Sequence, residues 1–246
     1  NILYASIGHG GGTSISGSSY DEHGQYNLQD IYDGNIAGPY SIDPLYSDTE
    51  RKAGNYIKSS INNHYWYGGL STLNLQVNDK LSISGGLDMR YYRGQHYKEV
   101  YDLLGGDYAI VNDDRTQLSL LKREGDIIGY HNDGIVKWSG IFSQAEYSNG
   151  MLSAFLNVSG SNSAYKRVDY FRKKDLVLAD TTIKEALGTH PYFGDMVSDT
   201  LTFNGKDYTI NSKEAQYTET DWKWIRGYTV KAGANVNLDE YNNVFF

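Results

Sequence analysis

Long stretches of this chain alternate apolar and polar residues with a period of two, which is typical of β-strands. Within residues 62–77, Leu73 and Leu75 lie on one face of the predicted strand, and Asn74 and Gln76 lie on the other. An apolar face opposite a polar face is the pattern of an antiparallel sheet that meets two different environments. We therefore predict an all-β protein.

The same alternation recurs along the whole chain. It predicts about seven strands, the last of them only a stub: 1–8, 62–77, 81–93, 134–147, 151–164, 222–238 and the stub from 244. The strand 62–77 is about three times as long as the usual strand of about 5–6 residues. A tilted strand needs about 9–11 residues to cross a bilayer, so these strands are long enough to do so.

Short and long connections alternate strictly between these strands. The short ones are 78–80, 148–150 and 239–243, and the long ones are 9–61, 94–133 and 165–221. A soluble sandwich has no reason to place every long loop at one end, because loops beyond about 12–15 residues are uncommon. Outer-membrane barrels have this asymmetry as a rule, with short periplasmic turns and long extracellular loops. We therefore predict an antiparallel transmembrane β-barrel segment.

Aromatic residues cluster where the predicted strands meet the long loops. The cluster comprises Tyr65, Trp66, Tyr67, Tyr91, Tyr92, Trp222 and Trp224. Tyrosine and tryptophan prefer the headgroup level of a membrane, so these residues are candidates for an aromatic belt. The alternative is ordinary β-propensity, since aromatic residues favour any strand.

Seven strands cannot close, because single-chain bacterial barrels begin at eight. We expect the chain to be one part of a larger barrel, since it starts and ends inside strands; assembly with further copies is the alternative. The long loops carry structure of their own. We expect a short helix around 25–33 and a small external hairpin over 201–210, where Asn204 and Gly205 form a turn signal.

Composition narrows the class of protein. The 246 residues include 23 tyrosines and no cysteine, and the formal net charge is −8. Abundant aromatic residues exclude a disordered chain, and the absence of cysteine excludes disulfides and thiol chemistry. The acidic balance argues against a nucleic-acid partner. No Ser-His-Asp or paired-carboxylate arrangement is visible by spacing, so we expect neither an enzyme nor a cofactor.

Two sets of residues are candidates for function. On the polar face, Asp88, Arg90, Glu146 and Lys231 would line the lumen of a barrel. In the long loops, the weak candidates for ligand contact are His9, His23, Tyr20, Tyr97 and Tyr101. No histidine pair has metal-binding spacing, and Asp113-Asp114 lacks the Ca²⁺-loop pattern, so we predict no metal site.

Several stretches resemble the TonB-dependent receptors of Gram-negative outer membranes. The resemblance is carried by strand and turn style over Ile2–Gly12, Asn62–Thr72, Leu87–Gly94, Tyr101–Tyr108, Gly233–Glu240 and Asn243–Phe246. It implies that residues 1–246 are a partial β-barrel domain from a barrel of about 22 strands. It also implies that the plug domain and the TonB box lie outside this chain.

The resemblance implies a function as well. Such a receptor lies in the outer membrane, in contact with its lipid, and takes up a scarce nutrient such as a siderophore, haem, a vitamin or a glycan. The small-molecule or glycan ligand binds at extracellular loops, and the TonB complex acts through the plug. A soluble secreted all-β carbohydrate-binding module is the alternative function. A passive porin-like channel is a third, and the presence or absence of a plug distinguishes it.

Overall fold

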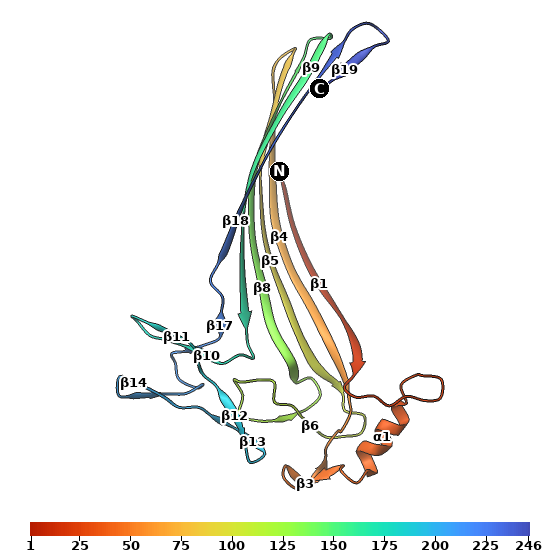
Figure 1. Cartoon of the computed structure of the whole chain (residues 1–246), viewed down its shortest axis with the longest axis vertical. Helices are drawn as coiled ribbons and strands as arrows, with labels where there is room; N and C mark the ends of the chain where they lie inside the picture. The colour runs from red at the N-terminus through yellow and green to blue at the C-terminus, as the bar shows by residue number, and fades with distance from the viewer.

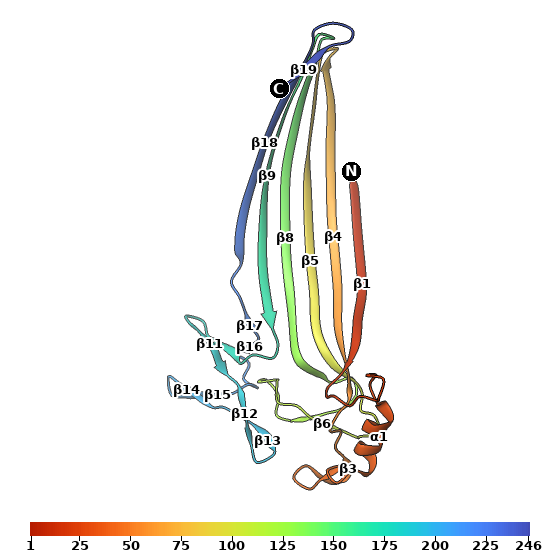
Figure 2. The same cartoon turned by 45° about the vertical axis from the view of Figure 1, so that its right-hand side comes forward.

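One open antiparallel sheet dominates the computed structural model, which describes residues 1–246 (Figure 1). In spatial order its strands are β1 (Ile2–Ile15), β4 (Ile57–Asn78), β5 (Leu81–Asp102), β8 (Ile127–Ser148), β9 (Leu152–Asp169), β18 (Lys223–Asn237) and β19 (Asn243–Phe245). An eighth strand, β17 (Thr218–Glu219), pairs with β9. The sheet is twisted and does not close, and β1 and β19 lie at opposite edges (Figure 2).

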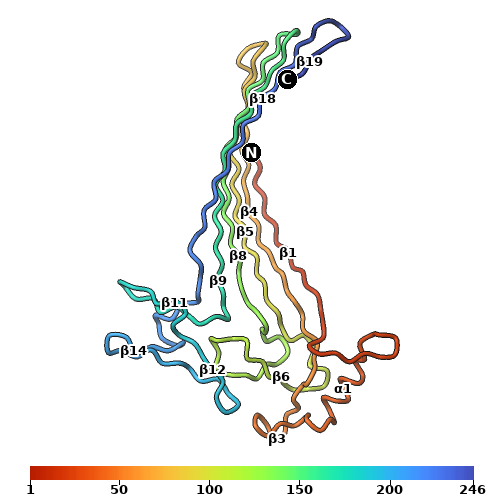
Figure 3. Tube along the Cα trace, in the orientation of Figure 1, coloured from red at the N-terminus to blue at the C-terminus, as the bar shows by residue number.

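The predicted all-β class and the antiparallel order of the strands are confirmed, and the chain by itself forms no closed barrel. The short turns lie at one end of the sheet, and the long connections lie at the other (Figure 3). We call these the turn end and the loop end. All seven predicted strands are present, so the alternation of short and long connections is also confirmed.

The predicted strands were too short at the loop end. β1 continues to Ile15, β5 continues to Asp102 and β8 begins at Ile127, well inside the predicted loops. These extensions mix polar and apolar residues without strict alternation: His96 lies opposite Asn62, whereas Val100 and Ile128 are buried in a core at the loop end. A period of two therefore does not reveal them. The aromatic residues of β4 and β5, placed by prediction at strand ends, lie within those strands, whereas Trp222 directly precedes β18 and Trp224 lies at its start, as predicted.

Each short turn is closed by an Asn or Asp side chain, which fixes the register of the strands. Asn78 Oδ1 accepts hydrogen bonds from the backbone N–H groups of Lys80 and Leu81, at 2.9 and 3.0 Å. Asn149 and Asp239 cap the other two turns in the same way. These local bonds explain why the turns were predictable from sequence.

Aromatic rings over glycines add to this register. Phe142 lies opposite Gly86, and Phe155 lies opposite Gly233. A Cβ atom at either glycine would stand less than 3 Å from the facing ring. A shift by one residue would place the Phe155 ring opposite Ala232 or Ala234 and would move the apolar residues to the wrong face.

The remaining elements lie at the loop end. They are α1 (Leu28–Ala37), β2 (Ile42–Asp43), β3 (Ser47–Arg51), β6 (Ala109–Ile110), β7 (Leu121–Lys122), β10 (Lys174–Val177), β11 (Thr182–Leu187), β12 (Thr189–Tyr192), β13 (Asp195–Ser198), β14 (Leu201–Phe203), β15 (Lys206–Tyr208) and β16 (Ala215–Gln216). The helix starts and ends later than predicted, because Asn27 caps it by accepting from the N–H of Asp30 at 3.1 Å. The hairpin β14–β15 is confirmed, and Asn204 and Gly205 turn it with φ of 51° and 74°.

Buried apolar residues gather at the loop end rather than in the sheet. One small core consists of Ala53, Val100, Leu103, Ala109 and Ile128. A second consists of Leu176, Leu187, Tyr208 and Ile210. The loops therefore fold against one another and against the strand ends. No helix in the structure combines the length and apolar character needed to cross a membrane.

Candidate functional site

One face of the sheet is apolar, and no other part of the chain covers it. Leu73, Gly85, Ser143, Val158 and Val230 form one row of directly opposed residues across five strands. The next row toward the turn end is Leu75, Ile83, Ala145, Leu156 and Ala232. Leu73 is 74% exposed and Val230 is 64% exposed, so this apolar face packs against no core.

The apolar face carries no charged side chain over a continuous band. The band spans residues 69–77, 81–91, 139–147, 154–164 and 228–236. In each of these ranges, only the alternate residues that lie on the apolar face belong to the band. These stretches are about 9–11 residues long, which is the length that a tilted strand needs to cross a bilayer. Tyr67 and Tyr91 pack together beside the band at its loop side, with ring centroids 6.4 Å apart. Of the aromatic cluster, Tyr65, Tyr67, Tyr91 and Trp224 thus lie on this face near the loop-side border of the charge-free band, whereas Trp66 and Tyr92 lie on the polar face.

The four residues predicted to share the polar face do so. The residues directly before and after Asp88 and Lys231 lie on the apolar face, so Asp88 and Lys231 themselves lie on the polar one. Across the sheet, Asp88 is in the row of Gly140 and Ser161, and Lys231 is in the row of Asn157 and Gln144. Arg90 Nη2 forms an ion pair with Asp88 Oδ2 at 2.6 Å, and its guanidinium lies 4.8 Å from the centre of the Trp138 ring. Glu146 accepts a hydrogen bond from the Gln144 amide.

The five candidate ligand residues do not form one site. Tyr20 and His23 lie in the loop before α1, as predicted, and Tyr20 stacks on Tyr26 with ring centroids 5.0 Å apart. The loop placement was wrong for three residues: His9 lies in β1, and Tyr97 and Tyr101 lie in β5. These three residues were placed in loops because β1 and β5 extend beyond their predicted ends. No hydrogen bond or ring contact joins any two of the five.

A polar cavity of about 350 Å³ lies at the loop end. Its lining includes Asp114 and Lys122 from the β5–β8 connection, His131 from β8, and Tyr170 and Tyr217 from the β9–β18 connection. Two long connections and one strand end therefore build it together. A concave site with a few polar groups and aromatic walls is typical of small-molecule binding.

Two ionisable side chains of the cavity, those of Asp114 and Lys122, are buried, and neither forms an ion pair, although the charge of Lys122 acts on Asp114. Asp114 is 5% exposed, and its Oδ1 accepts hydrogen bonds from the Thr116 N–H and hydroxyl, both at 2.7 Å. Burial raises the pKa of Asp114 above its usual value, although Thr116 and Lys122 oppose the shift. Lys122 is also 5% exposed and makes no ion pair within the chain. A buried carboxyl group and ammonium group are thus available to a polar ligand.

Three aromatic rings in contact form part of the cavity wall. The ring centroids of His131 and Tyr170 are 4.3 Å apart, with the planes tilted by 32°, and Tyr170 meets Tyr217 edge-on with centroids 5.0 Å apart. Tyr170 is held in place because its hydroxyl donates to Asp133 Oδ2 at 3.0 Å. Asp133 in turn accepts from Arg93 Nε at 2.7 Å. This chain of contacts fixes the aromatic wall to two strands of the sheet.

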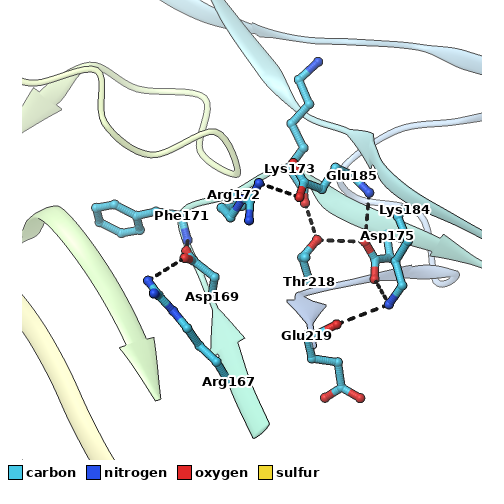
Figure 4. Close-up of polar contacts among 10 residues, drawn as sticks. All are labelled: Arg167, Asp169, Phe171, Arg172, Lys173, Asp175, Lys184, Glu185, Thr218 and Glu219. Carbon is cyan, nitrogen blue, oxygen red and sulfur yellow. Dashed lines mark hydrogen bonds and ion pairs between the residues drawn. The ribbon is translucent and has the colours of Figure 1, made fainter. Parts of the chain in front are cut away.

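A second buried carboxylate, that of Asp175, lies outside the lining of the cavity, in the same connection between β9 and β18 (Figure 4). Asp175 Oδ1 accepts from the Glu185 N–H and the Thr218 hydroxyl, both at 2.8 Å, and Oδ2 accepts from Lys184 Nζ at 3.0 Å. Burial alone would raise the pKa of Asp175, but these donors lower it below its usual value. The network joins β10, β11 and β17 and so positions Tyr217, the neighbour of Thr218 in sequence.

Of the cavity residues, the sequence suggested only Asp114 and His131 for consideration, both as possible metal ligands, and no metal site was predicted at either. Lys122, His131, Tyr170 and Tyr217 come from separate segments, so no spacing in the sequence links them. The structure has no group of three or more His, Asp or Glu side chains placed to hold a metal ion.

Comparison with protein families, with curated proteins and with solved structures found no match for this chain.

Proposed function

We propose that residues 1–246 form part of the barrel of a TonB-dependent importer in a Gram-negative outer membrane. The observation that carries the proposal is the charge-free band on the exposed apolar face. An exposed apolar surface of this extent needs a partner, and lipid chains match both its chemistry and its height. The antiparallel order and the segregation of loops from turns support the same proposal.

This proposal also assigns an orientation to the sheet in the membrane. The turn end faces the periplasm, and the loop end faces the exterior, where a scarce nutrient is bound. The polar face, with Asp88, Arg90, Glu146 and Lys231, lines the lumen of a barrel of about 22 strands. The cavity beside Asp114 is the candidate contact for a small polar ligand, and a plug driven by the TonB complex completes the importer.

The soluble carbohydrate-binding module receives less support. A soluble sandwich packs the apolar faces of two sheets against each other. Here Leu73, Leu87 and Val230 are 74%, 47% and 64% exposed. A second sheet that could cover them is absent, because the other sheets are short and lie at the loop end. A passive channel has the same barrel wall and differs in lacking a plug.

Single cysteines test both the membrane location and its direction, since the chain contains no cysteine. In the natural protein, Glu22→Cys places a thiol in an exposed loop and Lys80→Cys places one in a turn. A membrane-impermeant maleimide applied to intact cells should label the first and not the second. After the outer membrane is permeabilised, both should react.

Detergent dependence is the matching control. The natural protein should require detergent to stay monodisperse, because the apolar face is exposed. A protein that is monodisperse without detergent, or that labels equally at both cysteines on intact cells, would overturn the proposal.

A further inference from the structure

Positive charge appears on the apolar face where the charge-free band ends at its loop side. The strand register places Lys137 of β8, Lys166 of β9 and Arg226 of β18 on this same face. Lys137 lies opposite Ala164, and Ala164 lies opposite Trp224, two residues from Arg226. We call Lys137, Lys166 and Arg226 the cationic border.

The three cations are close enough to contact one anionic group. Neighbouring strands are about 4.8 Å apart and residues rise about 3.4 Å along a strand, so the Cα atoms of Lys137 and Arg226 are about 12 Å apart. Lys166 lies on β9, the strand between β8 and β18, one row of this face nearer the loop end than Lys137 and therefore about 14 Å from Arg226. Long, flexible lysine and arginine side chains can converge over that separation.

Acidic residues leave most of this charge unneutralised. Lys166 pairs with Glu219, whereas Lys137 and Arg226 form no ion pair within the chain. The Lys137 ammonium instead lies 4.5 Å from the centre of the Trp222 ring. Tryptophan beside lysine at the limit of an apolar surface is the arrangement expected at the headgroup level of a bilayer.

The turn side of the band has no comparable feature. There the first charges are Asp79 and Lys80, adjacent and of opposite sign, followed by Asp239 and Glu240 in the third turn. A cluster of cations on neighbouring strands at the border of the apolar face therefore marks the loop side alone.

We propose that the cationic border binds the phosphate group of an anionic lipid in the leaflet at the loop end. The inference rests on the proposed function, because it requires the apolar face to contact lipid. A lipid phosphate lies at the same depth as this border, next to the acyl chains that cover the band. Its negative charge complements the two unpaired cations.

The test compares two double variants of the natural protein, purified in a neutral detergent. Lys137→Gln/Arg226→Gln removes the unpaired cations. Lys223→Gln/Lys231→Gln removes the same charge from β18 on the polar face and is the matched control. Native mass spectrometry measures the binding of phosphatidylglycerol and phosphatidylcholine from mixed micelles. The unmodified protein should prefer phosphatidylglycerol, and the first variant should bind it about 30-fold more weakly, since each cation near an anionic surface contributes about fivefold.

Three results would overturn this inference. They are equal binding of both lipids by the unmodified protein, an unchanged preference in the first variant, and an equal loss in the control variant. A further arm adds inorganic phosphate at constant ionic strength. Phosphate should not displace the lipid, and displacement would assign the site to free phosphate instead. Failure of the proposed function is a separate outcome, because the protein would then be monodisperse without any detergent.

Discussion

Asp114 and Asp175 are buried carboxyl groups whose surroundings shift their pKa values in opposite directions. Burial dominates at Asp114 and raises its pKa. At Asp175 burial is outweighed by three donors, and the pKa falls. The surroundings of the first group therefore disfavour its charged form, as is common for binding groups, while the charged form of the second stabilises the loops.

Replacing Asp175 by asparagine should destabilise the β10–β17 region by about 2–3 kcal/mol, because the hydrogen bonds to a buried charge are lost. The Lys184 ammonium would lose its partner, and the amide could not accept from every donor now bound. Hydrogen exchange measured by mass spectrometry should show faster exchange over residues 174–219 with no change in β4 and β5. Unchanged protection over 174–219 would contradict a structural role for this carboxylate.

The same region should lose stability in acid. Because the folded-state pKa of Asp175 lies below the usual value of 3.8, its contribution is fully present above that value and disappears as the pH falls through the lowered pKa. The pKa of Asp199 is lowered too, mainly by its hydrogen bond with Lys173. Asp199 therefore also contributes stability that is lost in acid. Samples equilibrated between pH 5 and pH 2 and pulse-labelled under one fixed condition should show protection falling below about pH 4. The Asp175→Asn protein should show a smaller fall.

Asp114→Asn should have the opposite effect on stability. The amide oxygen can still accept from Thr116, and the cost of burying a charge disappears. Local stability should stay the same or rise, within about 1 kcal/mol. Hydrogen exchange over residues 107–126 reports this change. A marked loss of protection there would mean that Asp114 is a structural group rather than one available to a ligand.

At the scale of the strand, the two faces should tolerate charge very differently. Val230→Arg places a cation near the middle of the charge-free band and should cost about 2–4 kcal/mol in a bilayer. Leu87→Arg, one row nearer the loop end, should cost somewhat less. Ser84→Arg, on the polar face, is the control and should cost little. Urea unfolding from lipid vesicles measures all three, and equal tolerance on both faces would argue against lipid contact.

The strands and turns were predictable because their causes are local. Alternation at Leu73 and Leu75 assigns a face, and Asn78 closes its own turn. The strand extensions near His96 were missed because apolar and polar residues do not alternate strictly there. The short strands β10 to β13 were missed for another reason. Their pairing depends on contacts such as that of Asp175 with Thr218, which lies 43 residues away in sequence.

The cavity was less predictable than the polar face. Asp88 and Arg90 are two residues apart on one strand, so alternation alone places them together. Lys122 and Tyr217 reach the same cavity from different connections, and only the folded loops bring them together. A cavity formed between loops gives no periodic pattern in the sequence from which it could be predicted.

At the scale of the whole molecule, the two edge strands of the sheet carry backbone N–H and C=O groups that have no partner strand. β1 pairs only with β4, and β18 has no partner on its outer side until β19 pairs with Asn235–Asn237. Long unpaired edges expose backbone donors and acceptors that recruit other strands. In a bilayer such edges cannot persist, because no water satisfies them.

The 246-residue chain produced alone should therefore self-associate in neutral detergent, whereas the closed barrel that we propose should stay a discrete species. Sedimentation velocity over a range of concentrations measures the difference. The edge of β1 contributes most, since it is 14 residues long and largely exposed. A chain that remained a stable monomer in detergent would mean that its edges are satisfied in some other way, and barrel closure would no longer be required to explain the fold.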